Sequence, residues 1–280
     1  MAEAQKFRLA GIMGWPVAHS RSPMIHGHWI EVLGLSGAYV PLAVRPDRLS
    51  EAIKALPALG FAGCNVTIPH KEAAMRLVDC VDPVAKRIGA INTIVVETDG
   101  SLSGFNTDAF GFVEALKDTK PGWRADAGPA AVMGAGGGAR AVVASLAERG
   151  AKEIRVANRT VVRAEALARD FGAPVRAIPW EQRHDALDGA SLLVNTTSQG
   201  MTGQPPLDLA LDRLPKGALV CDIVYIPLET PLLEAARERG NAAVNGVGML
   251  IHQARAAFKA WFGVMPDATP DLRRLVEATI

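Results

Sequence analysis

Lys71 is the first residue of this sequence whose setting suggests chemistry. It follows the apolar, strand-like run Val66–Ile68 and Pro69 in the stretch GCNVTIPHK. An ammonium group at this position could donate a proton to an oxygen on which negative charge develops. A carboxylate beside it would favour the charged form of the lysine, and Asp108 in GFNTDAFGF is a candidate partner. Taken alone, Lys71 is more typical of a solvated surface lysine and Asp108 of a helix cap or turn.

A pair of hydroxyls lies earlier in the chain, in GWPVAHSRSPMIHG. Ser20 and Ser22 come just before Pro23, where we expect a helix to start. A serine at this position is most often an N-cap. Two hydroxyls together with free helix amides could instead hold a carboxylate. Asn92, in GAINTI, adds a further polar side chain to this part of the sequence.

A glycine turn after residue 133 has the pattern of a dinucleotide-binding loop. Ala130–Met133 is a short apolar strand, Gly134, Gly136 and Ala139 fit G-x-G-x-x-A, and a helix and the strand Glu153–Ala157 follow. The first glycine allows the tight turn, the second lets the backbone approach a pyrophosphate, and the alanine permits close helix–strand packing. Helix N-terminal amides then face the anion. The predicted loop residues are Gly134, Ala135, Gly136, Gly137 and Gly138.

The residues after the second strand of this unit favour NADP over NAD. An NAD site usually has Asp or Glu there, whereas this chain has Asn158, Arg159 and Thr160, with Arg163 one turn later. A guanidinium suits a dianionic 2′-phosphate through paired, charge-assisted hydrogen bonds. The alternative is that Arg159 and Arg163 are ordinary exposed charges.

Short apolar runs alternate with amphipathic stretches along the chain, which predicts an α/β protein with largely parallel sheets. The loose segment Lys117–Pro129 is expected to lead into a second domain. Asn195–Met201 and Asp222–Leu228 follow later apolar runs, so we expect them at the carboxyl edge of the second sheet, where ligands bind. The first elements expected are a strand at Phe7–Met13, a helix at Pro23–Leu33, a strand at Ala38–Val44 and a helix at Asp47–Leu56.

The composition excludes several classes of function. The 280 residues are 49% hydrophobic, and 30 Lys and Arg against 29 Asp and Glu give a net charge of +1, so neither nucleic acid nor an anionic membrane is an expected partner. Three cysteines without CxxC spacing argue against a zinc site and for a reducing cytoplasm. The histidines show no metal-ligand pattern. We see no signal peptide and no apolar run long enough to cross a membrane.

Together these stretches resemble one family, the shikimate dehydrogenases, in motif order and approximate spacing over nearly the whole chain. The matching motifs are Ser20-Arg21-Ser22-Pro23, Asn65-Val66-Thr67 with Lys71, Ile91-Asn92-Thr93, Asn106-Thr107-Asp108, GAGGGARA, NRT, NTTSQGM and NGVGMLIHQA. Two positions depart from the family pattern. Gly27 stands where Asn is common, and Gln199 is a less usual residue between Ser198 and Gly200.

The resemblance implies two α/β domains with the active site in the cleft between them. Residues 1–112 with 246–280 would form the substrate domain, and residues 113–245 a Rossmann-type NADP domain. Lys71 and Asp108 would be the catalytic pair. The implied substrate ligands are Ser20, Ser22 and Tyr225 for the carboxylate, and Thr67, Asn92, Asp108 and Gln253 for the ring hydroxyls. The implied cofactor residues are Gly134, Ala135, Gly136, Gly137, Gly138, Asn158, Arg159, Thr160, Arg163, Ile223 and Gly246.

The implied reaction is the reversible reduction of 3-dehydroshikimate to shikimate by NADPH, without a metal, in a cytoplasmic enzyme of aromatic amino-acid biosynthesis. A quinate/shikimate dehydrogenase that uses NAD or both cofactors is the nearest alternative. Ser22, rather than a bulkier threonine, favours shikimate, and Arg159 favours NADP. A non-catalytic NADP-responsive protein and a folate-processing dehydrogenase are more distant alternatives, and the second would leave the paired serines unexplained. The sequence does not give the oligomeric state, and a homodimer stays an open expectation.

Overall fold

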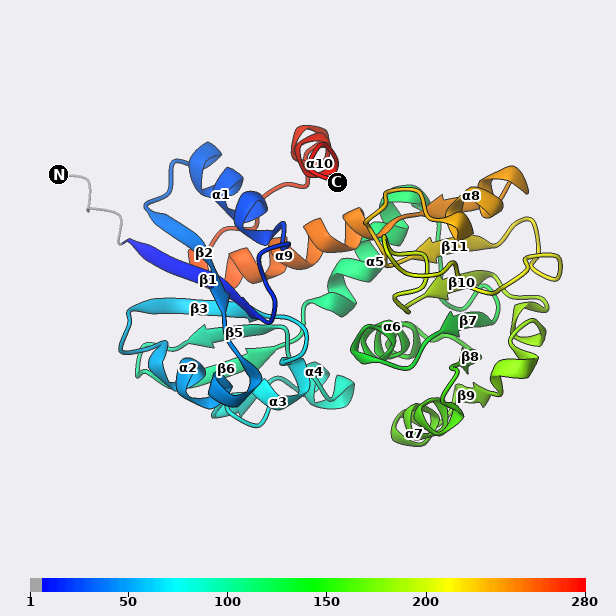
Figure 1. Cartoon of the computed structure of the whole chain (residues 1–280), viewed down its shortest axis with the longest axis horizontal. Helices are drawn as coiled ribbons and strands as arrows, with labels where there is room; N and C mark the ends of the chain where they lie inside the picture. Colours follow the sequence, from blue (N-terminus) through cyan, green and yellow to red (C-terminus); the bar gives the residue numbers. More distant parts are fainter. Residues whose placement is uncertain (1–6) are drawn as a thin grey trace. The chain divides into compact units, whose positions relative to one another are not determined.

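The computed structural model describes residues 7–280 and divides them into two compact units (Figure 1). The first six residues of the expected substrate domain therefore lie outside the described part. Unit 1 contains the described residues up to Thr107 together with Gln253–Val276, and unit 2 contains Asp108–His252 together with Glu277–Ile280. The boundaries expected from the sequence, after residues 112 and 245, fall inside helix α5 (Asp108–Thr119) and immediately before helix α9 (Gly246–Phe262).

Unit 1 is built on a six-stranded sheet with the strand order β2-β1-β3-β5-β6-β4. Strand β1 pairs in parallel with β2 and β3, whereas β5 runs antiparallel to both β3 and β6. The antiparallel pairing of β5 with β6 follows from the short turn that joins them, because a parallel crossover needs a dozen or more residues. The strands are β1 (Arg8–Gly14), β2 (Gly37–Ala43), β3 (Phe61–Val66), β4 (Cys80–Val81), β5 (Thr93–Val96) and β6 (Leu102–Phe105).

The first elements of unit 1 follow the sequence pattern closely. The predicted strand, helix and strand are confirmed to within one residue at each end, as β1, α1 (Ser22–Val32) and β2. The predicted helix at Asp47–Leu56 begins as a 3₁₀ turn, η1 (Pro46–Arg48), and continues as α2 (Leu49–Ala55). Helices α1 and α9 cover one face of the sheet, and α2 lies on the other face (Figure 1). The remaining helices of this unit are α3 (Lys71–Ala74), α4 (Pro83–Ile88) and α10 (Pro270–Glu277).

Helix α1 contains a glycine that the fold does not require. Gly27 lies inside α1, and a Cβ added there would meet no atom within 4 Å. We expect Gly27→Ala to raise the free energy of unfolding by about 0.5–1 kcal/mol, because alanine restricts the unfolded chain and favours the helix. Urea unfolding of the two proteins measures the difference. Gly60→Ala is the matched control, since Gly60 also has open space but has φ +73, where a side chain is strained. A gain in stability at Gly60 and none at Gly27 would contradict the explanation.

A cluster of buried rings lies between α1, β2 and α9. The imidazole of His26 stacks on Tyr39 with 4.0 Å between ring centroids and also contacts Trp29, Phe258 and Trp261. His26 is fully buried, and neither of its ring nitrogens has a hydrogen-bond partner within residues 7–280. Burial among these rings lowers the pKa of His26 to about 3, so the folded protein holds it neutral.

His26 makes the stability of the fold sensitive to acid. Unfolding exposes an imidazole that takes up a proton below its ordinary pKa of 6.5, so falling pH favours the unfolded chain, and above pH 6.5 the group contributes no pH dependence. We expect a loss of up to about 1.4 kcal/mol per pH unit between pH 6.5 and 4.5 from this group. Urea unfolding over this range should give a flatter pH profile for His26→Leu than for the wild type, whatever its stability at neutral pH. Parallel profiles would show that His26 does not titrate on unfolding.

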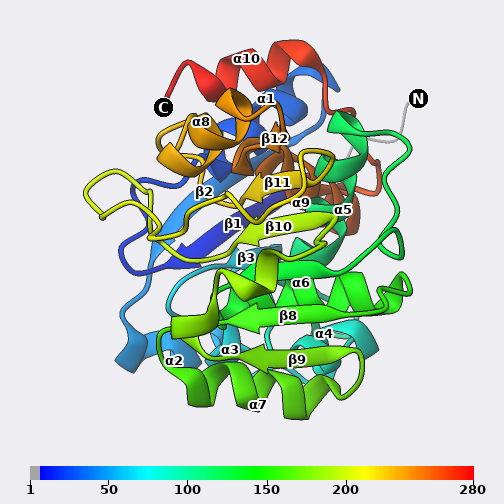
Figure 2. The ribbon, with the colours of Figure 1, turned by 90° about the vertical axis from the view of Figure 1, so that its right-hand side faces the viewer.

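Unit 2 has a second six-stranded sheet, all parallel, with the order β12-β11-β10-β7-β8-β9. Figure 2 shows β11, β10, β8 and β9 one above another. The predicted strand–turn–helix–strand is confirmed, with β7 at Ala130–Met133, α6 at Gly137–Glu148 and β8 at Ile154–Ala157. The remaining elements are α7 (Val161–Phe171), β9 (Val175–Ile178), η2 (Trp180–Gln182), η3 (Asp185–Leu187), β10 (Leu192–Asn195), β11 (Leu219–Asp222), α8 (Pro231–Glu238) and β12 (Ala242–Val244).

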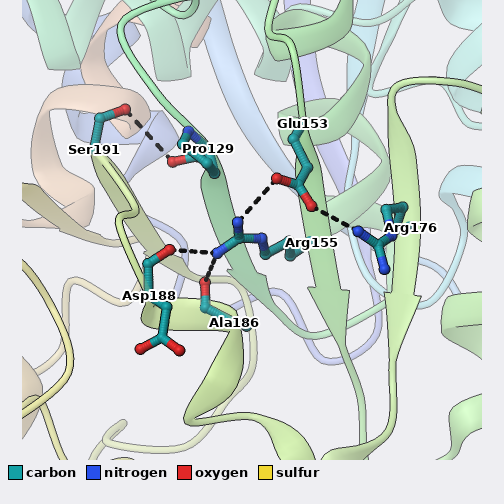
Figure 3. A network of polar contacts seen from close by, with 7 residues as sticks. All are labelled: Pro129, Glu153, Arg155, Arg176, Ala186, Asp188 and Ser191. Carbon is teal, nitrogen blue, oxygen red and sulfur yellow. Dashed lines mark hydrogen bonds and ion pairs between the residues drawn. The ribbon is translucent and has the colours of Figure 1, made fainter.

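An arginine fixes the edge at which β8 and β9 begin (Figure 3). One guanidinium nitrogen of Arg155 donates to the carbonyl oxygens of Ala186 (3.2 Å) and Asp188 (2.6 Å), and the other donates to Glu153 (2.9 Å). Arg176 on β9 donates to the second carboxylate oxygen of Glu153 at 3.0 Å. The hydrogen bond from Arg155 lowers the pKa of Glu153. These contacts hold two strands and η3 together at the edge opposite the glycine turn.

Neither a membrane span nor a cluster of metal ligands is found in the described part of the chain. No helix within residues 7–280 combines the length and apolar character that crossing a bilayer requires. The same residues contain no group of three or more His, Cys, Asp or Glu side chains placed to hold a metal ion.

Candidate active site

Lys71 is the first residue of helix α3, directly after a tight turn from β3. The amide of Thr67 donates to the carbonyl of Met13 (2.9 Å), and the amide of His70 donates back to Thr67 (2.8 Å). The buried ring of His70 lies 2.7 Å from the carbonyl oxygen of Val44. The carbonyl of Lys71 itself accepts from the amide of Ile91 at 3.1 Å. The backbone of this half-buried lysine and of the turn before it is therefore fixed by hydrogen bonds.

Asn92 is the centre of a buried hydrogen-bond network in unit 1. Its side-chain oxygen accepts from the amide of Thr107 (2.8 Å) and from the hydroxyl of Thr93 (2.9 Å). Its side-chain nitrogen donates to the Thr107 hydroxyl (3.0 Å) and lies 3.4 Å from the side-chain oxygen of Gln253 on α9. The structure thus brings together Asn92 and Gln253, two predicted substrate ligands 161 positions apart.

The same network continues to Ser22 through two residues that the sequence did not single out as ligands. The side-chain nitrogen of Asn65 donates to the carbonyl of Asn92 (3.0 Å) and to the Thr93 hydroxyl (3.1 Å). The Tyr39 hydroxyl donates to the side-chain oxygen of Asn65 at 2.7 Å. Burial raises the pKa of Tyr39, and a hydrogen bond with Ser22 opposes this shift. Tyr39, Asn65 and Thr93 therefore hold the predicted ligands in place.

The two serines do not occupy the capping position that is most usual for this pattern. Arg21 is the N-cap of α1, and Ser22 is already the first helical residue. The hydroxyl of Ser20 accepts from the amide of Ser22 at 3.2 Å, and Ser22 is 3% exposed. Neither serine is the N-cap residue, although the Ser20 hydroxyl accepts from the first amide of α1. Carboxylate binding by the two serines stays a prediction.

In unit 2 the glycine turn has the geometry that an approaching phosphate needs. Gly134 has φ +110, and a Cβ there would lie 2.5 Å from the hydroxyl oxygen of Thr196. Gly136 is the N-cap of α6, and a Cβ at Gly136 or Gly137 would meet nothing within 4 Å. The start of α6 at Gly136 and Gly137 therefore opens into free space, where helix amides can bind an anion.

A cavity of about 210 Å³ lies against this turn, at the carboxyl edge of the sheet. Loops that follow four different strands, β7, β8, β9 and β10, contribute to it. Five predicted cofactor residues line the cavity: Gly134, Ala135, Gly136, Asn158 and Arg159. Six other predicted cofactor residues do not: Gly137, Gly138, Thr160, Arg163, Ile223 and Gly246.

Five further residues line the cavity that were not predicted to bind the cofactor: Trp180, Thr196, Thr197, Ser198 and Gln199. The segment Asn195–Met201 did carry a signal, because it follows an apolar run and was expected at this edge of the sheet. Trp180 is separated from the end of β9 by Pro179 alone. Apart from this position after a strand, nothing in the sequence indicates that it lines a binding site.

A buried carboxylate supports the loop that carries Ile223 and Tyr225. Asp222, at the end of β11, accepts from the side chain of Asn195 (3.0 Å) and from the amide of Val224 (3.0 Å). Its other oxygen accepts from the hydroxyl of Thr230 at 2.7 Å. Burial raises the pKa of Asp222. The Asp222 side chain therefore binds the loop near its start, at Val224, and at its end, at Thr230. These two contacts fix the path of the chain through Tyr225.

Gly246 and Asp108 are each the first residue of a helix in unit 2. A Cβ at Gly246 would lie 2.2 Å from the carbonyl oxygen of Ile223, so only glycine fits at the start of α9. Asp108 is 6% exposed and directly follows Thr107, whose amide donates to Asn92. Asp108 is the first residue of unit 2, and the residue before it, Thr107, belongs to the Asn92 network of unit 1. Lys71 also belongs to unit 1. The action of Lys71 and Asp108 as a pair stays a prediction.

Comparison with known proteins identifies the family. Three family models match: "Shikimate dehydrogenase substrate binding domain" at residues 12–94, "Shikimate / quinate 5-dehydrogenase" at 120–202 and "Shikimate 5'-dehydrogenase C-terminal domain" at 246–275. A protein of Paramagnetospirillum magneticum named shikimate dehydrogenase (NADP(+)) is 58% identical over 97% of this chain and 98% of its own length. The chain belongs to the shikimate dehydrogenase family.

Solved structures of shikimate dehydrogenase family members and related enzymes have the same fold. A Thermus thermophilus shikimate 5-dehydrogenase, in complex with NADP(H) and shikimate, is 40% identical with a TM-score of 0.87, covering 98% of this chain and 100% of that one. A quinate dehydrogenase of Corynebacterium glutamicum, in complex with NAD, is 32% identical with a TM-score of 0.88, covering 98% and 99%. The expected α/β fold with a substrate domain and a Rossmann-type domain is thereby confirmed.

Proposed function

We propose that this chain catalyses the reversible, NADP-dependent reduction of 3-dehydroshikimate to shikimate. The observation that supports this most is the buried network on Asn92, which reaches Asn65 on β3, the strand before Lys71's helix, and ends next to Asp108 in sequence. A polar set of this kind suits a small polyhydroxylated acid, because amide and hydroxyl side chains both donate to and accept from substrate hydroxyls. The relative that is 58% identical carries the name of this activity.

The proposed chemistry needs a proton donor beside the reacting carbonyl. NADPH, when bound, supplies the hydride that reaches the carbonyl carbon. The ammonium of Lys71 donates a proton to the carbonyl oxygen as negative charge develops on it. Asp108 holds this lysine in place and accepts a hydrogen bond from a neighbouring substrate hydroxyl. In the oxidative direction Lys71 takes the proton back.

The other polar residues orient the substrate and the cofactor. Ser20, Ser22 and Tyr225 bind the substrate carboxylate, and Thr67, Asn92 and Gln253 bind the ring hydroxyls together with Asp108. The pyrophosphate lies on the glycine turn and the first turn of α6. The remaining proposed cofactor contacts are Asn158, Arg159, Thr160, Arg163, Ile223 and Gly246.

The domain roles, assembly and location form part of the same proposal. Unit 1 contains most of the proposed substrate ligands and unit 2 the nucleotide cavity, which supports the proposal that residues 1–112 with 246–280 bind the substrate and residues 113–245 bind NADP. We infer a cytoplasmic enzyme from the three unpaired cysteines, Cys64, Cys80 and Cys221. A homodimer is the proposed assembly, and sedimentation of the purified protein tests it.

Initial rates test the proposed function. Purified protein is assayed with shikimate or quinate, each with NADP or NAD, by following nicotinamide reduction. We expect the rate with shikimate and NADP to exceed the other three clearly. Comparable rates with quinate or NAD would favour the dual-specificity alternative. A quinate dehydrogenase in complex with NAD has the same fold. Binding of NADP without any turnover would favour a non-catalytic binding protein.

Arg159 provides a separate test of cofactor choice. It lines the cavity beside Asn158 and its side chain is exposed. We expect Arg159→Ala to raise the dissociation constant for NADP by about 10- to 100-fold, the loss typical of charge-assisted hydrogen bonds to a phosphate. The dissociation constant for NAD should change little. Titration calorimetry with both cofactors measures the effect.

Arg169→Ala is the matched control for this test. Arg169 is an exposed arginine near the end of α7, the helix that follows the loop carrying Arg159, and it does not line the cavity. Its replacement should leave both dissociation constants unchanged. Equal weakening of NADP and NAD by Arg159→Ala would show that this residue does not recognise the 2′-phosphate.

A further inference from the structure

Trp180 is an aromatic side chain in the wall of the nucleotide cavity to which neither the sequence motifs nor the reaction assigns a role. It is the first residue of η2, directly after Pro179 and β9. It lines the cavity together with Arg159 and the glycine turn. Part of the indole packs against the buried core of unit 2, and the half-buried side chain leaves the rest accessible.

The indole of Trp180 is held in place from outside the cavity by Arg183. The guanidinium carbon of Arg183 lies 4.9 Å from the centre of the indole ring, and one of its nitrogens donates to the Trp180 carbonyl at 3.0 Å. The same guanidinium donates to the carbonyl and to the carboxylate of Asp208, both at 2.6 Å. A cation–π contact with an anchored arginine, together with core packing, makes the indole a rigid surface.

The position of Trp180 along the sheet edge determines which part of a dinucleotide it can meet. The strand order places β7, β8 and β9 side by side, so the loops after them follow one another outward from the glycine turn. The pyrophosphate belongs at the turn after β7, and the adenosine ribose at the end of β8, beside Asn158 and Arg159. The next group outward is the adenine base, and the next loop along the edge is the one that carries Trp180.

We propose that Trp180 is the adenine platform of this site, with its indole stacked against the purine. The inference rests on the proposed NADP-dependent function and adds a binding residue to it. An aromatic side chain offers a flat face that any base can stack on, without reading its hydrogen-bonding edge. Trp180 therefore contributes affinity for the adenosine end of both cofactors, whereas Arg159 distinguishes NADP from NAD.

Adenosine fragments separate these two contributions. Titration calorimetry of 2′,5′-ADP and of 5′-AMP is carried out with the wild type, Trp180→Ala and Trp180→Phe. We expect Trp180→Ala to weaken both fragments by about 5- to 150-fold, equivalent to about 1–3 kcal/mol of stacking. Trp180→Phe should retain most of the affinity because it keeps an aromatic face. Arg159→Ala, in contrast, should weaken only 2′,5′-ADP.

Controls distinguish loss of stacking from loss of structure. Trp123→Ala and Trp123→Phe change a half-buried tryptophan of unit 2 that does not line the nucleotide cavity, and they should leave both affinities unchanged. If Trp180→Ala does not fold, the fluorescence of the wild type and of Trp180→Phe provides the test. Binding of 2′,5′-ADP should change the tryptophan emission of the wild type and leave that of Trp180→Phe nearly unchanged.

Unchanged affinity in a folded Trp180→Ala, or a fluorescence response that survives in Trp180→Phe, would overturn the inference. Either result would leave the proposed function intact as long as the wild type binds 2′,5′-ADP and NADP. Failure of the wild type to bind NADP or either fragment would instead refute the proposed function and, with it, the platform.

Discussion

Replacing Lys71 with alanine is expected to lower kcat for shikimate oxidation by about 10²–10⁴, the range typical of lost proton transfer, with a much smaller change in KM. The variant should fold, because the backbone hydrogen bonds at this position and the contact of the neighbouring His70 ring remain in it. Loss of the ammonium removes the group that moves the proton to and from the substrate oxygen. Steady-state rates with saturating NADP measure the effect.

Two further variants show whether this loss is specific to Lys71. Lys54→Ala removes an exposed lysine of α2 and should leave kcat unchanged. Asp108→Asn keeps the shape of the side chain but removes its charge, so it should also lower kcat. Normal turnover in Lys71→Ala would exclude Lys71 as the proton donor. A loss in Asp108→Asn as large as that in Lys71→Ala would show that the two residues share the transfer.

The second large effect is expected at Gly63, inside strand β3. Trp261 on α9 is 1% exposed, and its indole nitrogen donates to the carbonyl of Ile94 at 2.9 Å. A Cβ at Gly63 would lie 2.0 Å from that carbonyl oxygen and 2.4 Å from that nitrogen. The added methyl would separate two buried partners and overfill the space around them, each at a cost of about 1–3 kcal/mol. We expect Gly63→Ala to lower the free energy of unfolding by about 2–6 kcal/mol.

Urea unfolding measures this change, and two other variants check its cause. Gly27→Ala adds the same methyl in open space and should stabilise the protein. Trp261→Phe removes the indole nitrogen, so Gly63→Ala should destabilise the Trp261→Phe background by less than it destabilises the wild type. A change at Gly63 no larger than that at Gly60 would show that the backbone yields at little cost.

The sequence predicts those elements whose pattern is local. The strand Ala130–Met133 and the turn at Gly134 were predicted to the residue, because an apolar run, a glycine spacing and a helix lie next to each other in the chain. The antiparallel pairing of β5 with β3 was not predicted. Strands of four residues carry almost no periodicity, and their partners are chosen by packing rather than by propensity.

The candidate site shows the same division between local motifs and distant partners. Asn92 and Gln253 were identified from their motifs, but no local pattern indicates that Tyr39 and Asn65 would join them in one network. Trp180 was missed for a related reason. An aromatic residue after a strand is usually a core residue, and only the cavity in the folded chain shows that this one also faces a ligand site.

Helix α9 has a consequence for the order in which the chain can fold during synthesis. Unit 2 is formed almost entirely by the continuous stretch Asp108–His252, whereas unit 1 needs Gln253–Val276 in addition to its first hundred residues. The ring cluster around His26 includes Phe258 and Trp261, so it stays incomplete until these residues have left the ribosome. The segment made first is therefore the one completed last, and its apolar face must remain uncovered while unit 2 is being made, the situation in which chaperones assist nascent chains.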